Sequence, residues 1–271
     1  KMESIAFVFF FIFIVYSFFI GWIAYGFKKV ISFETTDLQA KTKFSIVVPF
    51  RNEAKNLPEL LYSLSQLDYP RNLFEVVFVN DASQDNSVEI IEQFPALSFS
   101  YQLIENDRKS NSPKKDAIAT AINFIQNDWI ITTDADCFVS QEWLKTIDNY
   151  IQKHQPEMIV GAVSYLADES FLQQFQQMDL MSLQGATVGS FGIKKPFMCN
   201  GANFAYSKKL FQDVNGFEGN NGIASGDDVF LLQKATKKYP EKVHYLKSDA
   251  NIVLTKPLDD FKSLFHQRVR W

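Results

Sequence analysis

The fold is decided by residues 44–67, "FSIVVPFRNEAKNLPELLYSLSQL". Its first seven residues, 44–50, form a short apolar run that suits a buried β-strand. Leucines then recur at three- and four-residue spacing, the pattern of one face of an α-helix; they are Leu57, Leu60, Leu61, Leu64 and Leu67. This stretch therefore predicts a buried strand followed by a helix, the repeating unit of α/β proteins.

The same strand–helix unit recurs along the chain. Further strands are expected at 74–80, 98–104 and 128–134, and the helices that follow them at 84–94, 112–125 and 140–151. Beyond residue 155 the pattern is less regular and predicts a strand at 157–165, a helix at 170–189 and a loop leading into a helix at 221–235. Four such units in series predict the α/β class, with a mostly parallel sheet covered by helices on both faces.

A long apolar segment precedes these units. Residues 4–27, "SIAFVFFFIFIVYSFFIGWIAYGF", carry no charge and as a helix would span about 36 Å, against about 30 Å for the hydrocarbon core of a bilayer. A buried core helix is rarely apolar all round, and no small-residue cleavage site follows, so we predict a retained transmembrane anchor. Residues 28–43 are expected to form a linker. Lys28 and Lys29 predict that the rest of the chain faces the cytoplasm from the cell (inner) membrane.

The overall composition excludes several classes of protein. The 271 residues carry a net charge of −4, which argues against a nucleic-acid partner held by a broad basic face. Two cysteines are too few for a disulfide framework or a thiolate zinc site. No glycine-rich phosphate loop is present, which argues against a P-loop ATPase.

Acidic and polar residues follow three of the predicted strands, in "PFRNE" (49–53), "VNDASQD" (79–85) and "TDAD" (133–136). Because the carboxyl ends of parallel strands share one edge of a sheet, we expect these groups to converge where ligands bind. Asp134 and Asp136 suit a hard divalent cation. They could instead cap the next helix, although Ser140 can do so itself. Asp81 could bind a nucleotide base or ribose, or serve as an ordinary turn residue.

Three further groups have two interpretations each. Asp227 and Asp228 begin a predicted helix, where acids favour the helix dipole or could supply a general base. Lys114 and Lys115 lie in the first turn of another helix, as a solvated pair or as a diphosphate-holding pair. The final "QRVRW" is either an amphipathic helix end or an aromatic platform beside phosphate-binding arginines.

Taken in order, these segments resemble the family 2 glycosyltransferases of the GT-A fold, especially the membrane-bound branch related to cellulose, chitin and hyaluronan synthases. The resemblance covers 44–271 and rests on these motifs: "SIVVPFRNEAKNLPELLYSL", "EVVFVNDASQDNS", "KKDAIATAI", "DAD", "NGANFAYSKKLF", "SGDDVFLLQKA" and "QRVRW". It implies one GT-A domain over 44–271. It also implies that the chain ends before further membrane helices.

The resemblance also assigns roles to residues. It places nucleotide-sugar binding at Pro49, Arg51, Glu53, Asp81, Lys115 and Asp134. It makes Asp136 the ligand of Mn²⁺ or Mg²⁺ and Asp228, or alternatively Asp227, the catalytic base. Gln267, Arg270 and Trp271 would lie at the acceptor and diphosphate end. Asn80 stands where many members have an Asp.

The implied activity is a metal-dependent, inverting transfer of a sugar from a UDP- or GDP-linked donor to a hydroxyl of a lipid or glycan. Two other functions are compatible with the same residues. One is a metal-dependent phosphohydrolase with Asp134 as nucleophile. The other is a non-catalytic membrane protein that binds nucleotide sugars.

Overall fold

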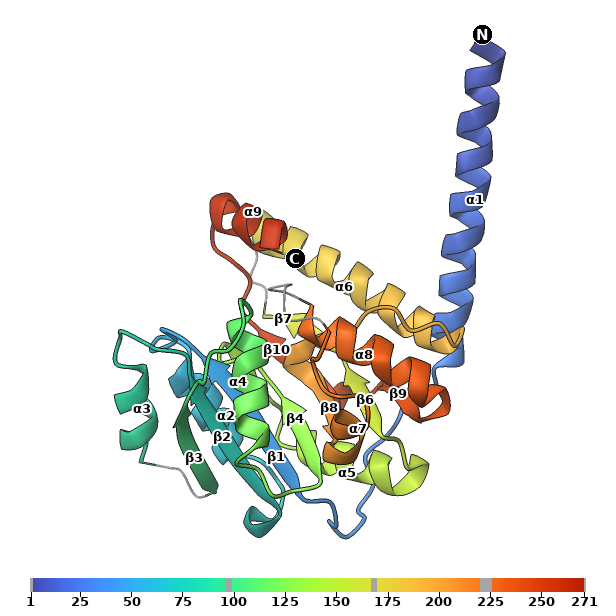
Figure 1. Ribbon diagram of the computed structural model, residues 1–271. Helices are drawn as coiled ribbons and strands as arrows, with labels where there is room; N and C mark the ends of the chain where they lie inside the picture. The colour runs from blue at the N-terminus through green and yellow to red at the C-terminus, as the bar shows by residue number, and fades with distance from the viewer. Residues whose placement is uncertain (1, 96–98, 167–169, 220–225, 271) are drawn as a thin grey trace.

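The computed structural model describes residues 2–95, 99–166, 170–219 and 226–270. A seven-stranded sheet of order β3-β2-β1-β4-β8-β6-β9 forms its centre (Figure 1). Its strands are β1 (Phe44–Phe50), β2 (Phe74–Asn80), β3 (Ser100–Glu105), β4 (Trp129–Thr132), β6 (Met158–Gly161), β8 (Phe204–Ser207) and β9 (Val243–Leu246). A second sheet of order β5-β10-β7 contains β5 (Cys137–Phe138), β7 (Val163–Tyr165) and β10 (Val253–Thr255).

Helices cover both faces of the large sheet, and α1 projects away from it (Figure 1). The helices of the described ranges are α1 (Met2–Lys29), α2 (Leu57–Ser65), α3 (Ser87–Gln93), α4 (Pro113–Ile122), α5 (Trp143–His154), α6 (Phe171–Gly192), α7 (Lys208–Asp213), α8 (Asp227–Lys238) and α9 (Phe261–Arg270). Strand β1 shows why: Ile46 and Val48 belong to one apolar core with the leucines of α2, whereas Val47 belongs to a second core with Ala117 of α4. A strand buried on both faces needs the continuous apolar run that the sequence has.

The predicted α/β class and mostly parallel sheet are confirmed. Strands β1, β2, β3 and β4 pair in parallel, as do β6 and β9. Strand β8 is the exception in this sheet, because it runs antiparallel to both of its neighbours, β4 and β6.

Two local expectations were wrong. The single strand expected at 157–165 is two strands in different sheets, because the carbonyl of Ala162 accepts hydrogen bonds from Val253 N (3.0 Å) and Asn203 Nδ2 (2.8 Å) and the chain changes sheet there. The helix expected from Ser140 begins at Trp143, with Glu142 as its N-cap. The Ser140 hydroxyl instead donates to the carbonyl of Ala250.

Helix α1 projects away from the domain as one continuous helix (Figure 1). In the described part of the chain, one helix is long and apolar enough to cross a membrane, Ile5–Lys29. The side chains of residues 5–22 are exposed, and Ile23 and Gly26 are buried where α1 meets α6.

The segment between α1 and β1 is attached to the domain along its length. Phe33 N donates to Lys247 O over 2.7 Å, and Thr36 N donates to Asn149 Oδ1 over 2.8 Å. Thr42 N donates to Asp148 Oδ1 over 3.1 Å. The expected linker therefore lies against α5, and helix α1 continues through Lys29 before it begins.

Candidate active site

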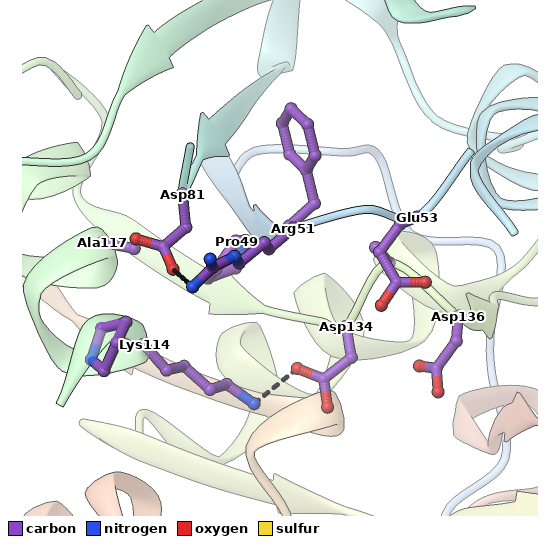
Figure 2. Close-up of a pocket in the computed structure, with 11 residues that line it drawn as sticks. Pro49, Arg51, Glu53, Asp81, Lys114, Ala117, Asp134 and Asp136 are labelled. Atoms are coloured by element: carbon purple, nitrogen blue, oxygen red, sulfur yellow. Dashed lines mark hydrogen bonds and ion pairs between the residues drawn. The ribbon is translucent and has the colours of Figure 1, made fainter. Parts of the chain in front are cut away.

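The ends of three parallel strands enclose a cavity of about 470 Å³ (Figure 2). Phe50 pairs with Asn80 and Val47 with Thr132, so the segments that follow β1, β2 and β4 emerge side by side. The lining residues are Pro49, Phe50, Arg51, Glu53, Asp81, Pro113, Lys114, Ala117, Asp134, Ala135 and Asp136. Six of the predicted site residues lie in this lining: Pro49, Arg51, Glu53, Asp81, Asp134 and Asp136. Lys115, in α4, and the predicted residues of the later groups lie outside it.

The loops after β1 and β2 are bonded to each other. Asn52 N donates to Ser83 Oγ over 3.0 Å, and Asn52 Oδ1 accepts from Gln84 N over 2.7 Å. Asn52 and Ala82 both have φ of 57°, a left-handed conformation that costs roughly 1–2 kcal/mol in a residue other than glycine. The cross-loop bonds hold this strained backbone, and the side chains next to it, Arg51 and Asp81, lie together at the cavity (Figure 2).

Asp81 is held by a clamp that sequence reasoning missed. Arg108 Nε and Nη2 donate to its two carboxylate oxygens, each over 2.5 Å, and Asn106 Nδ2 donates to Oδ1 over 2.7 Å. Burial alone would raise the pKa of Asp81, but these bonds outweigh it and keep the pKa below its ordinary value. Arg108 and Asn106 follow β3, so the strand-end rule used for the other three strands could have found them.

Asn80 and Asp85 shape the same loops. Asn80 Oδ1 accepts from Ser83 N over 2.9 Å, and its amide donates to Glu105 over 2.8 Å. Asp85 accepts from Ala54 N over 3.1 Å and from the Ser87 hydroxyl. Both side chains therefore hold the loop backbone in place.

Lys114 lies across the cavity from Arg51. Its Nζ donates to Asp134 Oδ1 over 2.5 Å (Figure 2). Burial disfavours the charge on Lys114, but Asp134 and then Asp227 outweigh that effect and raise its pKa. The neighbouring Lys115 is buried outside the cavity lining, with Nζ 5.5 Å from the ring centre of Phe230. The structure thus brings Lys114, and not Lys115, to the predicted donor residues.

Asp136, like Glu53 in the same lining, has no cationic partner among the described residues. It is half-buried, and none of the ion pairs between described residues involves it. Burial and then the charge of Asp134 raise its pKa. Within the described ranges, no three His, Cys, Asp or Glu side chains group as a metal site. A divalent cation bound by Asp136 and Asp134 would therefore take further oxygens from water or from a ligand, as Mg²⁺ commonly does.

Asp228 borders this arrangement from the first turn of α8. Its Oδ2 accepts from the backbone N–H of Gly201 over 2.7 Å. A Cβ placed on Gly201 would lie 3.4 Å from Asp228 Oδ2 and 3.6 Å from Lys114 Nζ. Asp228 and Lys114 therefore both lie next to Gly201. Burial, and then the neighbouring Asp227, raise the pKa of Asp228 to about 6, against the opposing charge of Lys114. Such a carboxylate is poised to accept a proton near neutral pH.

The predicted C-terminal motif is only partly described. Gln267 is half-buried in α9, and its Oε1 meets no hydrogen-bond partner among the described residues. Arg270 is the last residue of α9, and Trp271 lies outside the described residues. Helix α9 is bonded to α6 through Arg268 and Asp179.

Residues 45–214 match the family described as Glycosyl transferase family 2, over more than half of the chain. The chain belongs to this family. The matched region contains the whole cavity lining and the Gly201 loop, and it ends before Asp227 and Asp228.

Relatives of this family 2 chain include TarS, the poly(ribitol-phosphate) beta-N-acetylglucosaminyltransferase of Staphylococcus aureus, 30% identical over 118 residues that are 44% of this chain and 20% of TarS. The undecaprenyl-phosphate 4-deoxy-4-formamido-L-arabinose transferase of Shewanella sediminis is 38% identical over 133 residues, which are 48% of this chain and 39% of that protein. The family 2 chain thus spans less than half the length of either relative.

Two solved structures share the fold of the family 2 chain. TarS residues 1–349 in complex with UDP-GlcNAc match with a TM-score of 0.59 at 20% identity, over 80% of this chain and 59% of that one. The mannosyltransferase PcManGT of Pyrobaculum calidifontis, in complex with GDP-Man and Mn²⁺, matches with a TM-score of 0.65 at 19% identity, over 92% and 66%.

Proposed function

We propose that this chain is a membrane-anchored, inverting glycosyltransferase that moves a sugar from a UDP- or GDP-linked donor to a hydroxyl of a lipid or glycan. One observation carries the proposal: Lys114 lies between two sets of carboxylates, Asp134 and Asp136 on one side and Asp228 on the other. In such a centre, Lys114 and a cation held by the first set would stabilise the leaving diphosphate. Asp228 would serve as the base for the attacking hydroxyl.

The donor would occupy the cavity. Its volume of about 470 Å³ lies within the range of ligand pockets, about 300–1,000 Å³. Asp81, oriented by Arg108, offers carboxylate oxygens to a base or ribose at one end. Lys114 offers a cation to the diphosphate at the other. The UDP-GlcNAc and GDP-Man complexes of the two structural neighbours support a nucleoside diphosphate sugar as donor.

A divalent cation fits this donor end. Asp136 has a carboxylate that no described cation neutralises, and burial and then the charge of Asp134 raise its pKa. Asp136 would hold the ion, and Asp134 would lie near both the ion and the diphosphate. When bound, Mn²⁺ or Mg²⁺ supplies positive charge that stabilises a departing diphosphate.

Asp228 would act as the general base. It would take the proton of the acceptor hydroxyl while that oxygen forms a bond to the anomeric carbon, and the bond between that carbon and the diphosphate oxygen breaks with inversion. Asp228 is favoured over Asp227 because the backbone N–H of Gly201 fixes its carboxylate and its pKa is raised to about 6.

Helix α1 would place the reaction at the membrane. Its uncharged length supports a transmembrane anchor, as in the membrane-bound branch of the family, and Lys28 and Lys29 support a cytoplasmic catalytic domain. The printed name of the Shewanella sediminis relative includes undecaprenyl-phosphate, which supports a lipid acceptor. A glycan acceptor is the alternative.

The test incubates the purified full chain with a panel of UDP- and GDP-sugars, Mn²⁺ or Mg²⁺, and membrane lipid extract. Nucleoside diphosphate release and labelled product are both measured. The Asp228→Asn variant should bind donor like the wild type and lose transfer. Transfer at the wild-type rate in that variant would remove Asp228 from the role of base. Phosphate release with a trapped aspartyl-phosphate would favour the phosphohydrolase, and donor binding without turnover would favour the non-catalytic binding protein.

A further inference from the structure

Helix α6 has one continuous outer face with two different halves. Positions at alternating spacings of four and three residues share one side of a helix. On this side α6 carries Phe171, Phe175, Met178, Ser182, Gly185, Gly189 and Gly192. Large apolar side chains thus occupy its first half and glycines its second half.

Helix α1 covers the last two of these glycines, Gly189 and Gly192. A Cβ on Gly189 would lie 2.4 Å from the carbonyl oxygen of Ile23, and one on Gly192 would lie 1.8 Å from that of Gly26. The two backbones are therefore in direct contact, as at crossings of small residues between membrane helices. Ile23 and Gly26 are the buried positions among residues 5–29 of α1.

The apolar half of the same face is uncovered. Phe171 and Met178 are 79% and 61% exposed. Helix α9, bonded to α6 by Arg268 and Asp179, adds Phe265 at 68%. Both helices lie at the end of the domain from which α1 projects (Figure 1). We call the exposed residues of these two helices the apolar face: Phe171, Phe175, Met178 and Met181 of α6, with Phe261, Phe265 and Val269 of α9.

We propose that the apolar face lies on the surface of the bilayer that α1 crosses. The proposal rests on α1 being the membrane anchor of the proposed function. Since α1 crosses the outer face of α6 at Ile23 and Gly26, its membrane segment lies beyond that face. The rest of the face must then look toward the same bilayer. Apolar side chains on a helix that lies in the interface suit this position.

Charge at the crossing agrees with a lipid partner. Lys28 and Lys29 end α1, and Lys194 and Lys195 follow the end of α6, so four lysines gather where the two helices meet. Lys194 is also paired with Glu241 over 3.4 Å, at an exposed position. Lysines at this level suit anionic headgroups. A second copy of the chain would bring the same four lysines toward one another, which disfavours it as the occupant.

This contact has a consequence for the acceptor. From Gly189 at the crossing to its first residue, Phe171, helix α6 spans about 27 Å. Two glutamines near that end hold the surrounding loops, because Gln176 exchanges hydrogen bonds with the backbone of Leu258 (2.8 and 3.0 Å) and Gln177 accepts from Tyr165 N (3.0 Å). With both ends of α6 at the bilayer, the distance between the active site and the membrane surface would be fixed. An acceptor held in the membrane could then reach the site.

Single cysteines test the contact in the full chain. The native Cys137 and Cys199 are buried, so an introduced surface cysteine can be labelled selectively with an environment-sensitive fluorophore. The variants are Met178→Cys and Phe265→Cys in the apolar face, with Phe10→Cys in α1 as the positive control. Phe124→Cys is the matched control, because Phe124 is 49% exposed and lies between α4 and β4, at the sheet edge opposite the cavity.

Each labelled protein is reconstituted into vesicles of phosphatidylcholine and phosphatidylglycerol, with or without brominated acyl chains. Labels at 178 and 265 should be quenched at least half as strongly as the label at 10, and the label at 124 should be unaffected. If only the label at residue 10 is quenched, the proposed contact between the apolar face and the bilayer is wrong, but the membrane anchor is supported. No quenching at 10 would overturn the anchor and this inference together, whereas sugar transfer is measured independently. A blue shift at 178 that follows protein density and not brominated lipid would overturn the inference in favour of a protein partner.

Discussion

The backbone N–H of Gly201 donates a 2.7 Å hydrogen bond to Oδ2 of Asp228. The carbonyl of the same glycine accepts from the hydroxyl of Thr132, on β4, over 2.6 Å. Through these two bonds, the strand that leads into Asp134 also fixes the orientation of the proposed base on α8. The two halves of the site are therefore coupled through one residue, Gly201.

Thr132→Val should lower kcat and leave the KM for donor unchanged, because it releases the Gly201 loop without touching the cavity lining. A lost hydrogen bond of about 1 kcal/mol corresponds to roughly a fivefold effect. Thr133→Val is the matched control, since the buried Thr133 hydroxyl meets no hydrogen-bond partner among the described residues. Steady-state kinetics measure kcat for both variants. An equal decrease in kcat in Thr132→Val and Thr133→Val would contradict the coupling.

The pH dependence of kcat/KM should show an acid limb near pH 6. Burial and Asp227 raise the pKa of Asp228 to about 6. A general base must be deprotonated, so activity falls as pH drops through that value and is constant above it. Asp227→Asn removes a like charge and should move the limb to lower pH, whereas Lys114→Gln removes an opposing charge and should move it to higher pH. Shifts of the same sign in both variants would exclude Asp228 as the titrating group.

Arg108→Lys should weaken donor binding. Lysine keeps the positive charge but cannot make the two parallel bonds to the Asp81 carboxylate. A charged hydrogen bond of about 1.5–3 kcal/mol predicts a loss in affinity of roughly ten- to a hundredfold. Calorimetric titration with UDP and GDP measures it. The neighbouring Lys109→Ala, at a largely exposed residue paired with Asp107, should bind like the wild type.

Removal of divalent metal with a chelator should abolish transfer, and Mn²⁺ should restore it. Asp136→Asn should raise the Mn²⁺ concentration for half-maximal activity by at least tenfold, since an amide is a weaker ligand than a carboxylate for a hard cation. Glu53→Gln is the comparison, because Glu53 shares the cavity lining but was not assigned to the metal. Full activity in the chelated enzyme would remove the metal from the mechanism.

Gly192→Leu should destabilise the chain by about 1–3 kcal/mol, the usual cost of overpacking a close contact. A Cβ at this position would lie 1.8 Å from the carbonyl oxygen of Gly26, whereas one on Gly185 of the same helix meets no atom within 4 Å. Gly185→Ala should therefore melt at or above the wild-type temperature in detergent. Equal melting temperatures for wild type and Gly192→Leu would show that α1 does not pack on α6 as described.

The order of strands and helices could be predicted because strands buried on both faces, such as β1 and β2, have continuous apolar runs, and helical segments such as α2, with its periodic leucines, follow them. The convergence of Arg51, Asp81 and Asp134 followed from the rule that parallel strands end at one edge. The sheet of β5, β7 and β10 could not be predicted, since strands of two or three residues have no detectable period and Cys137 pairs with Thr255, far along the chain.

The phase of a helix was equally difficult to predict. Lys114 and Lys115 differ by about 100° around α4. Only the packing of α4 on the sheet decides which of them reaches the cavity. The contact between Arg108 and Asp81 could have been predicted, because the rule that parallel strands end at one edge applies to β3 as well as to its neighbours.

The close crossing of α1 and α6 also bears on how a water-soluble version of the protein would be made. Cutting the chain after Lys29 would expose the Gly189 and Gly192 surface together with the apolar face, and we expect such a fragment to aggregate. A version that begins shortly before Ile23 would keep the last two turns of α1 as a cover for the glycines. Its apolar face would still need polar substitutions at Met178 and Phe265.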